Sequence, residues 1–128
     1  MKKTVFLTGA TGNMGAAGLA ELLKKKDLYN IVLLARPSKI NKEKLAYLKD
    51  EESVKIVWGD LLNYDDILTC VTGADIVLHV GGMVSPQADY FPKRTIKTNT
   101  EAAKNIVKAV LAQPNKDEIK VVYIGTVA

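Results

Sequence analysis

The stretch Met1–Gly18, which is MKKTVFLTGATGNMGAAG, decides the fold of this chain. A short apolar run, Val5–Leu7, is followed by Gly9, Gly12 and Gly15 and then by an alanine-rich segment with a helical pattern. This order predicts a strand, a glycine turn and a helix. In such a turn the first glycine allows a sharp bend, the second lets a phosphate approach the backbone, and the third lets the helix pack against the strand. The free N–H groups and positive dipole at the start of the helix favour a dinucleotide pyrophosphate as the ligand.

The residues predicted to hold the pyrophosphate all lie in this turn and at the start of the helix. They are Gly9, Thr11, Gly12, Asn13, Met14 and Gly15. Three glycines alone are weak evidence, because glycines are common in turns. Here they follow a β-branched apolar run and precede a helical pattern, which is the context that the motif requires. We therefore favour a ligand site over the alternative, a glycine turn without a ligand.

Length and composition indicate one folded domain. The chain has 128 residues, of which 48% are hydrophobic and 25% charged, enough for one core. No apolar run reaches the length of a membrane span, no signal-peptide pattern is found, and the single cysteine, Cys70, cannot form an internal disulfide. These features predict a cytoplasmic protein without a membrane partner. The net charge of +4 is spread along the chain, which argues against a nucleic-acid partner, and no spacing typical of a metal site occurs.

Helical and apolar segments alternate beyond the glycine turn. Helices are predicted at about 13–26, 41–49, 63–73 and 95–112, strands at 31–35, 54–58, 76–80 and 120–124, and a loop at 83–93. The long helix is expected to bury Ile96, Ala103, Val107, Val110 and Leu111. Alternating strands and helices imply right-handed crossovers and a parallel sheet. We therefore predict an α/β fold with a Rossmann-type, doubly wound parallel sheet of about five strands in the order 3-2-1-4-5, and a nucleotide across the carboxyl ends of the strands.

The residue after the second strand bears on the choice of cofactor. In dinucleotide folds a carboxylate about 20 residues beyond the glycines bonds the adenosine ribose, whereas an arginine accommodates a 2′-phosphate. Here the strand ends in Arg36 and no carboxylate follows it directly. The planar guanidinium offers donors that match a phosphate. We therefore predict NADP, with NAD still possible and Lys39 as a second contact. The alternative is that Arg36 is a solvated loop residue.

Nearly the whole chain resembles the short-chain dehydrogenase/reductase superfamily, and its extended branch in particular. The glycine turn has the spacing TGxxGxxG of that branch, and Gly59-Asp60-Leu61 matches the turn after its third strand. The resemblance implies that Asp60 bonds the adenine amino group and that Leu61 packs beside the ring. A simpler alternative is that Asp60 only caps the turn that follows.

Two further segments carry the same resemblance. The segment His79-Val80-Gly81-Gly82 is similar to a turn of the family that lines the cofactor ribose, although two glycines replace the usual alanines. The resemblance thus implies cofactor contacts at His79, Gly81 and Gly82, and a supporting place near the active site for Asn99. We favour a structural, hydrogen-bonded role for His79 over general-base catalysis. Asn99 would alternatively bond only within its own helix.

The resemblance also implies a catalytic position at the end of the fifth strand. In the family a hydroxyl at this place orients the substrate carbonyl, and Thr126 occupies it here. Its partner is a Tyr-x-x-x-Lys pair on one helix face. The 128 residues hold no such pair: the tyrosines at 29, 47, 64, 90 and 123 are followed four residues later by Leu, Glu, Leu, Arg and Val. We therefore expect residues 1–128 to be the NAD(P)-binding N-terminal part of a longer enzyme, truncated before the catalytic helix and inactive alone.

Two functions are consistent with these features. The first is the cofactor-binding part of an NADP-dependent oxidoreductase or a sugar-nucleotide epimerase/dehydratase-like enzyme, which transfers hydride to or from a small-molecule substrate. The alternative is a non-catalytic regulatory module that senses NADP on the same fold, because a fold does not fix a function. A truncated sheet would leave an open strand edge and an unpartnered helix face. These favour a homodimer.

Overall fold

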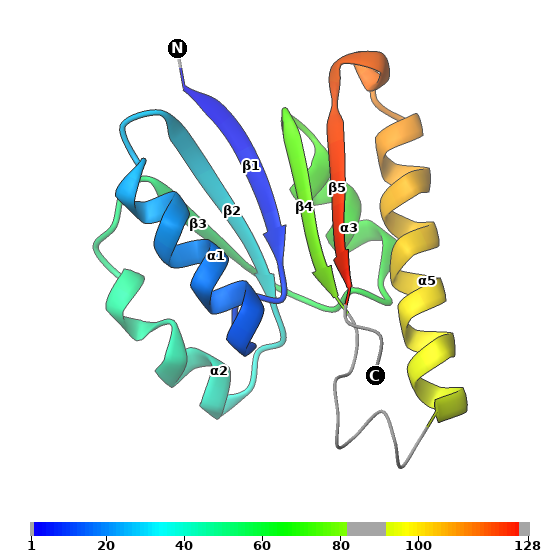
Figure 1. The fold of residues 1–128 in the computed structure, drawn as a ribbon, viewed down its shortest axis with the longest axis horizontal. Coiled ribbons are helices and arrows are strands. Elements are labelled where there is room, and N and C mark those ends of the chain that lie inside the picture. The colour runs from blue at the N-terminus through cyan, green and yellow to red at the C-terminus, as the bar shows by residue number, and fades with distance from the viewer. Residues whose placement is uncertain (1, 82–91, 126–128) are drawn as a thin grey trace.

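One parallel β-sheet with helices on both faces makes up the protein (Figure 1), and the computed structural model describes residues 2–81 and 92–125. The strands are β1 (Lys3–Thr8), β2 (Tyr29–Ala35), β3 (Val54–Trp58), β4 (Ile76–Gly81) and β5 (Lys120–Gly125). The helices are α1 (Asn13–Lys24), α2 (Lys39–Lys44), α3 (Tyr64–Val71) and α5 (Pro92–Leu111), with 3-10 turns at Ala46–Leu48 and Lys116–Glu118. The strand order β3-β2-β1-β4-β5, with all described pairs parallel, confirms the predicted Rossmann-type sheet.

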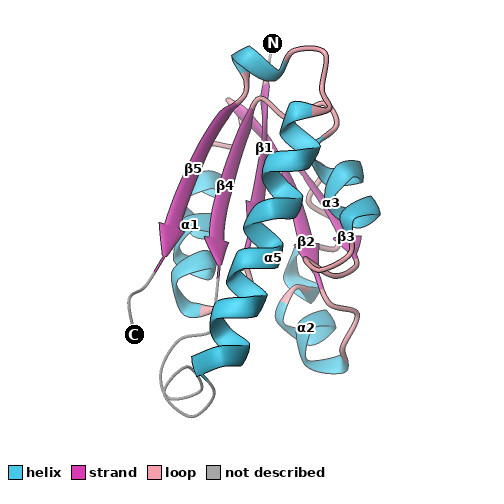
Figure 2. Ribbon diagram, turned by 90° about the vertical axis from the view of Figure 1, so that its right-hand side faces the viewer, coloured by secondary structure: helices cyan, strands magenta, loops and turns pink. Residues whose placement is uncertain are grey.

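Two hydrophobic cores lie on opposite faces of the sheet because side chains alternate along each strand. Helices α1 and α2 cover one face, and α3 and α5 cover the other (Figures 1 and 2). Phe6 and its neighbour Leu7 belong to different cores for this reason. The core under α3 and α5 includes Phe6, Leu34, Ile67, Cys70, Val71, Val77, Ile106 and Val110, and the core under α1 and α2 includes Leu7, Leu19, Ile31, Leu33, Leu45 and Leu48.

The strand register brings the functional loops to one end of the sheet. Thr8 pairs with Leu34, and Ala35 pairs with Trp58, so the carboxyl ends of β1, β2 and β3 are level. On the other side Gly81, at the end of β4, pairs with Gly125 at the end of β5. The loops that follow β1, β2 and β3 therefore leave the sheet side by side.

Several predicted boundaries are wrong by a few residues. Helix α1 ends at Lys24, two residues early, and β2 begins at Tyr29. The helix predicted at 41–49 consists of α2 and a 3-10 turn. Helix α2 starts earlier than predicted because the Ser38 hydroxyl accepts a hydrogen bond from the Asn41 N–H and caps the helix there. Helix α5 starts at Pro92, a residue type suited to a first helical position. The predicted loop at 83–93 lies mostly outside the described residues.

The buried face of α5 is also not the one predicted. Val107 and Leu111 are 54% and 61% exposed, whereas Ala102, Ile106, Ala109 and Val110 are buried. The two alanines let α5 lie close against α3, with which it packs. Ala103 is half-buried and Val110 is buried as expected, and Ile96 lies outside the residues whose side chains are described.

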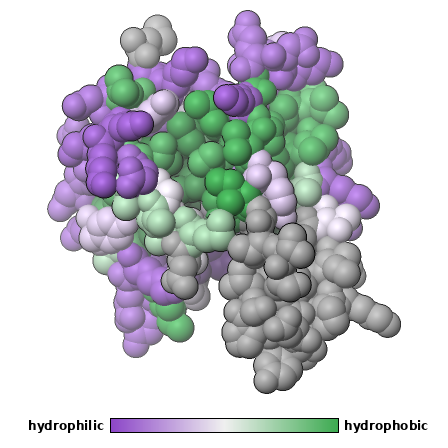
Figure 3. All heavy atoms as spheres, in the orientation of Figure 1, coloured by the Kyte–Doolittle hydropathy of each residue, from purple (hydrophilic) through white to green (hydrophobic). Residues whose placement is uncertain are grey.

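An apolar surface remains on the α1 side of the sheet. Figure 3 shows it beside α1, over β1, β4 and β5. A groove of about 290 Å³ lies there, lined in part by Leu22, Ile76 and Leu78. In the described part of the chain, no helix has the length and hydrophobicity that crossing a bilayer requires.

Candidate functional site

The glycine turn joins β1 to α1 and depends on two of its glycines for packing. Gly9 has φ +74°, a conformation that side chains disfavour, and a Cβ there would overlap the carbonyl oxygen of Val80 on β4. A Cβ on Gly15 would overlap the carbonyl oxygen of Gly9, so α1 sits directly on the turn. The roles predicted for these two glycines, a sharp bend and close helix packing, agree with this geometry.

Gly12 differs, because the protein's own packing does not require a glycine there. It is exposed, and a Cβ would only reach ordinary van der Waals contact with Gly9, at 3.5 Å from its carbonyl oxygen. Gly12 is the N-cap residue of α1 and has no side chain to satisfy the helix N–H groups, and no acidic residue lies in the first turn of the helix. Within the described part of the chain, no side chain caps this end of α1, so its positive dipole and N–H donors suit an anionic ligand.

A buried threonine ties β1 to β4 behind the turn. Thr8 is fully buried, and its Oγ1 accepts a hydrogen bond from the Val80 N–H at 3.0 Å and lies 2.7 Å from His79 Nδ1. His79 is 3% exposed, and its ring lies 5.2 Å from the ring of Tyr123 on β5. Burial lowers the pKa of His79, so a neutral ring is favoured. These contacts agree with the structural role that we favoured for this histidine.

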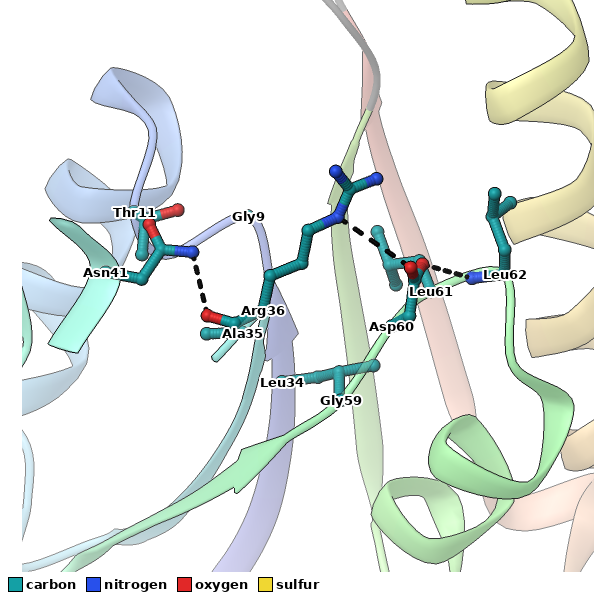
Figure 4. Close-up of a pocket in the computed structure, with 10 residues that line it drawn as sticks. All are labelled: Gly9, Thr11, Leu34, Ala35, Arg36, Asn41, Gly59, Asp60, Leu61 and Leu62. Carbon is teal, nitrogen blue, oxygen red and sulfur yellow. Dashed lines mark hydrogen bonds and ion pairs between the residues drawn. The ribbon is translucent and has the colours of Figure 1, made fainter. Parts of the chain in front are cut away.

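A pocket of about 180 Å³ lies beside the glycine turn, at the carboxyl ends of β1, β2 and β3 (Figure 4). It is smaller than the ~300–1,000 Å³ of a complete small-molecule site, and so it fits one part of a dinucleotide. Its walls come from three loops, from the end of β2 and from α2. The lining residues are Gly9, Thr11, Leu34, Ala35, Arg36, Asn41, Gly59, Asp60, Leu61 and Leu62.

The loop after β3 is held by two helices. Asp66 on α3 accepts a hydrogen bond from the Asp60 N–H at 3.0 Å, and a Cβ on Gly59 would overlap the Asp66 side chain. On the other side, Asn105 of α5 donates to the Leu61 carbonyl oxygen at 3.0 Å. Because both helices pack on the core, this loop has a fixed position in the pocket wall.

One basic side chain lines the pocket, and a second contacts another lining residue. The Nε of Arg36 is 3.8 Å from Oδ2 of Asp60, and both side chains are partly exposed. Lys44, at the end of α2, donates to the Thr11 carbonyl oxygen at 3.1 Å and so brings a positive charge to the glycine turn. Asn41 donates to the Arg36 carbonyl oxygen at 3.0 Å and fixes the start of this loop. The site combines two cations with one carboxylate.

Cys70 has no place in this chemistry. It is 2% exposed in the core beneath α3, and burial raises the pKa of its thiol to about 12, which keeps it protonated. The described residues include no group of three or more His, Cys, Asp or Glu side chains placed to hold a metal ion.

Most of the predicted cofactor-binding residues meet at this end of the sheet. The residues that line the pocket are Gly9, Thr11, Arg36, Asp60 and Leu61. Gly12 lies in the adjoining turn, and Met14 and Gly15 lie in the first turn of α1. Lys39, expected as a second contact, is not among the residues that line the pocket. Asn13 begins α1, Asn99 lies in α5 and Gly81 ends β4, but their side-chain surroundings lie outside the described part. Gly82 and Thr126 lie outside it altogether.

The sequence analysis missed several residues that build the site. Thr8, Asn41, Lys44, Asp66 and Asn105 all make hydrogen bonds that fix the turn or the pocket walls. Thr8 directly precedes the first glycine, which is a signal that could have been used. Asn41 and Asp66 lie only five and six residues from the loop positions that they bond. Lys44 and Asn105 bond residues 33 and 44 positions away, where no local pattern marks them.

The fold and this site define a dinucleotide-binding domain of the Rossmann type. The family model of the NAD dependent epimerase/dehydratase family matches residues 5–128. The chain therefore belongs to this family, which confirms the resemblance to the extended branch of the short-chain dehydrogenases/reductases.

Curated relatives agree with this assignment. The chain is 32% identical over 128 residues to the UDP-glucose 4-epimerase of Rickettsia bellii (strain RML369-C) and 30% identical to that of Rickettsia typhi. Each match covers 97% of this chain and 36% of the relative. The chain thus spans about a third of the length of these epimerases.

Solved structures share the fold. The X-ray structure of Pen from Bacillus thuringiensis superposes with a TM-score of 0.78 at 25% identity, over 95% of this chain and 38% of that one. A short-chain dehydrogenase/reductase from Veillonella parvula in complex with NADP gives a TM-score of 0.65 at 23% identity, over 96% of this chain and 47% of that one. The second likeness concerns the fold alone.

Proposed function

We propose that residues 1–128 bind NADP(H) and form the cofactor-binding part of an NAD(P)-dependent oxidoreductase or epimerase/dehydratase. The observation that carries this proposal is the position of Arg36. It follows β2 directly and lines the pocket beside the glycine turn, where an NAD-selective site has a carboxylate. A guanidinium at this place favours the 2′-phosphate that NADPH has and NADH lacks.

The residues present suit such a cofactor. The pyrophosphate would lie over Gly12 and the open N–H groups of α1, and the adenosine half would occupy the pocket of about 180 Å³. Leu61 and Leu34 offer apolar walls to the adenine ring, and Asp60 offers an acceptor to its amino group. When bound, the cofactor would supply hydride transfer at its nicotinamide.

Calorimetry with NADPH and NADH tests this proposal on the chain as it is. We expect NADPH to bind more tightly, and Arg36→Gln to weaken NADPH binding by about tenfold while changing NADH binding little, because one charge-assisted contact to a phosphate is lost. Lys116→Ala removes the same charge in the turn before β5, at the other end of the sheet, and should change neither affinity. Absence of NADPH binding to the wild-type chain would refute the proposal.

Catalysis is proposed for the longer protein and not for this chain alone. The similarity to UDP-glucose 4-epimerases over 97% of the chain supports a sugar nucleotide as the substrate, with Thr126 and Asn99 assisting a Tyr-x-x-x-Lys pair from beyond residue 128. The regulatory alternative, an NADP sensor, would bind cofactor in the longer protein without converting any substrate. Assays of UDP-glucose epimerisation and of NADPH oxidation separate the two, and the isolated chain should show neither activity.

We also propose that the chain forms a homodimer through the outer face of α5. Val107 and Leu111 are exposed there, beside a groove of about 490 Å³ lined also by Ala103. Apolar groups that remain in water favour association.

A further inference from the structure

The mouth of the pocket holds an ion pair between two residues to which we gave separate roles. Arg36 follows β2 and Asp60 follows the neighbouring strand β3, and the Nε and Oδ2 atoms are 3.8 Å apart. The side chains are 64% and 44% exposed, so the pair faces solvent at the place where a ligand would enter. Among the described residues, Asp60 is the only ion-pair partner of the Arg36 guanidinium.

Asp60 is the more fixed member of the pair. Its N–H donates to Asp66 on α3 at 3.0 Å, and its Oδ1 accepts from the Leu62 N–H at 2.9 Å. Arg36 has a long side chain, and Figure 4 shows its two terminal nitrogens pointing away from the Asp60 carboxylate. The guanidinium therefore directs two donor groups that bond no described residue toward the outside, while its Nε lies beside the carboxylate.

A 2′-phosphate and the Asp60 carboxylate are both anions that a guanidinium attracts, with the carboxylate beside Nε and the terminal nitrogens facing outward. NADPH would have to share Arg36 with Asp60 or replace Asp60, and its phosphate would stay close to a second negative charge. NADH has no such phosphate and leaves the pair unchanged. The negative charge of Asp60 thus weakens the binding of NADPH through Arg36 and does not act on NADH in this way.

We infer that Asp60 is a positioning residue that acts through Arg36 and sets how strongly this chain prefers NADPH over NADH. This inference rests on the proposed NADP(H) binding. It implies that the wild-type preference for NADPH is held below the level that Arg36 alone would give. The effect is modest because exposed ion pairs are weak and are screened by salt.

The test is the substitution Asp60→Asn, with NADPH and NADH titrated calorimetrically at one low ionic strength. Asparagine keeps one oxygen that can accept from the Leu62 N–H and replaces the oxygen beside Arg36 with an uncharged NH2 group. Any change in the contact to the adenine amino group affects both cofactors alike. Because the adenine contact is common to both cofactors, we expect the ratio of the Kd for NADH to the Kd for NADPH to rise about three- to tenfold, as for the loss of one exposed charge interaction with a phosphate.

The same substitution in an Arg36→Gln background shows whether Asp60 acts through Arg36. In that background Asp60→Asn should change the logarithm of the ratio of the two Kd values by less than half of the change that it causes when Arg36 is present. Asp27→Asn is the matched control, because Asp27 is exposed in the turn before β2, at the opposite end of the sheet, and carries the same charge. It should leave both affinities unchanged.

Several results would overturn the inference. These are an unchanged ratio of the two Kd values, an undiminished rise of this ratio in the Arg36→Gln background, or the same rise from Asp27→Asn. If the wild-type chain binds no NADPH at all, the proposed function itself fails. If it binds NADPH through Arg36 and Asp60→Asn has no effect, only the present inference fails.

Discussion

Gly9 and Gly12 lie three residues apart in one turn, yet a methyl group at each would meet different surroundings. At Gly12 the methyl group has room, so Gly12→Ala should change the free energy of unfolding by less than about 0.5 kcal/mol. The same methyl group points to the place of the pyrophosphate, so cofactor affinity should fall at least about tenfold. Urea unfolding, followed by the fluorescence of the single tryptophan, Trp58, and calorimetry with NADPH measure the two effects.

Gly9→Ala is the comparison that makes this result specific. Its φ of +74° and the overlap with the Val80 carbonyl oxygen should lower the free energy of unfolding by about 1–3 kcal/mol or more. Equal losses of stability in the two variants would contradict the division between packing and ligand binding, as would a Gly12→Ala variant that binds NADPH normally.

His79 should make the stability of the chain depend on pH. Burial lowers its pKa below the ordinary value of 6.5, so the unfolded chain binds a proton more readily than the folded chain. Stability is then complete above about pH 7.5 and falls as the pH decreases through 6.5, by at most about 1.4 kcal/mol per pH unit for one proton. Urea unfolding at pH 7.5 and 5.5 checks the direction.

His79→Gln isolates this effect because His79 is the single histidine of the chain. The variant should be less stable at both pH values but should lose less on acidification. Glu51, whose pKa is lowered by the hydrogen bond from the Ser53 N–H, affects stability only below its ordinary value of 4.5, outside this interval. An equal pH dependence in the wild type and the variant would contradict the assignment to His79.

At the scale of the elements, the strands and their order in the sheet could be predicted from local patterns of apolar residues. The strands at residues 54–58 and 76–80 are marked by short apolar runs, and the sheet order follows from their alternation with helices. The face of α5 could not be predicted in this way. Its sequence has two apolar stripes, and the choice of Ile106 over Val107 for the core depends on how closely α3 approaches.

Helix α2 is the element whose contribution is most open to test. It has six residues and buries none of them, so the hydrogen bond from the Asn41 N–H to the Ser38 hydroxyl is a large part of what stabilises it. Ser38→Ala should lower the free energy of opening of the helix by about 1 kcal/mol. This corresponds to about fivefold faster hydrogen exchange at its amides. NADPH affinity should fall with it, because Asn41 and Lys44 lose their fixed positions beside the pocket.

Ser38→Thr is the control, since threonine keeps a capping hydroxyl. Hydrogen exchange measured by NMR should be close to that of the wild type in this variant, and global unfolding should be nearly unchanged in both. Exchange at α2 that is equally fast in Ser38→Ala and Ser38→Thr would show that the cap has no role.

At the scale of the whole molecule, the site is an assembly of segments that local patterns describe separately. The position of Gly9 and Arg36 at one end of the sheet was predictable because each directly follows a strand, and parallel strands bring such positions together. The links from Lys44 to Thr11 and from Asn105 to Leu61 join residues 33 and 44 positions apart. Only the packing of the helices on the sheet brings them into contact, so no single stretch of sequence indicates them.

The outer surface of α5 leads to the last prediction, which concerns self-association. Ala103, Val107 and Leu111 follow one another at intervals of four along the helix, and Val121 and Tyr123 are exposed on the edge strand of the described sheet. Val121 pairs with Val77 and Tyr123 pairs with His79 on the neighbouring strand β4. Val77 belongs to the core under α5, so the exposed side chains of Val121 and Tyr123 lie on the same side of the sheet as α5 with its exposed Val107 and Leu111. A second copy of the chain would cover these groups.

Sedimentation equilibrium should therefore give twice the mass of 14.0 kDa at micromolar concentration. Leu111→Glu should shift the equilibrium to the monomer by at least about tenfold in Kd, because a charge would be buried against apolar groups. Leu28→Glu, at an equally exposed leucine before β2, should not. If Val121→Lys dissociates the dimer and Leu111→Glu does not, the contact lies at the edge of β5 instead of on α5. A monomer at every concentration would exclude both contacts.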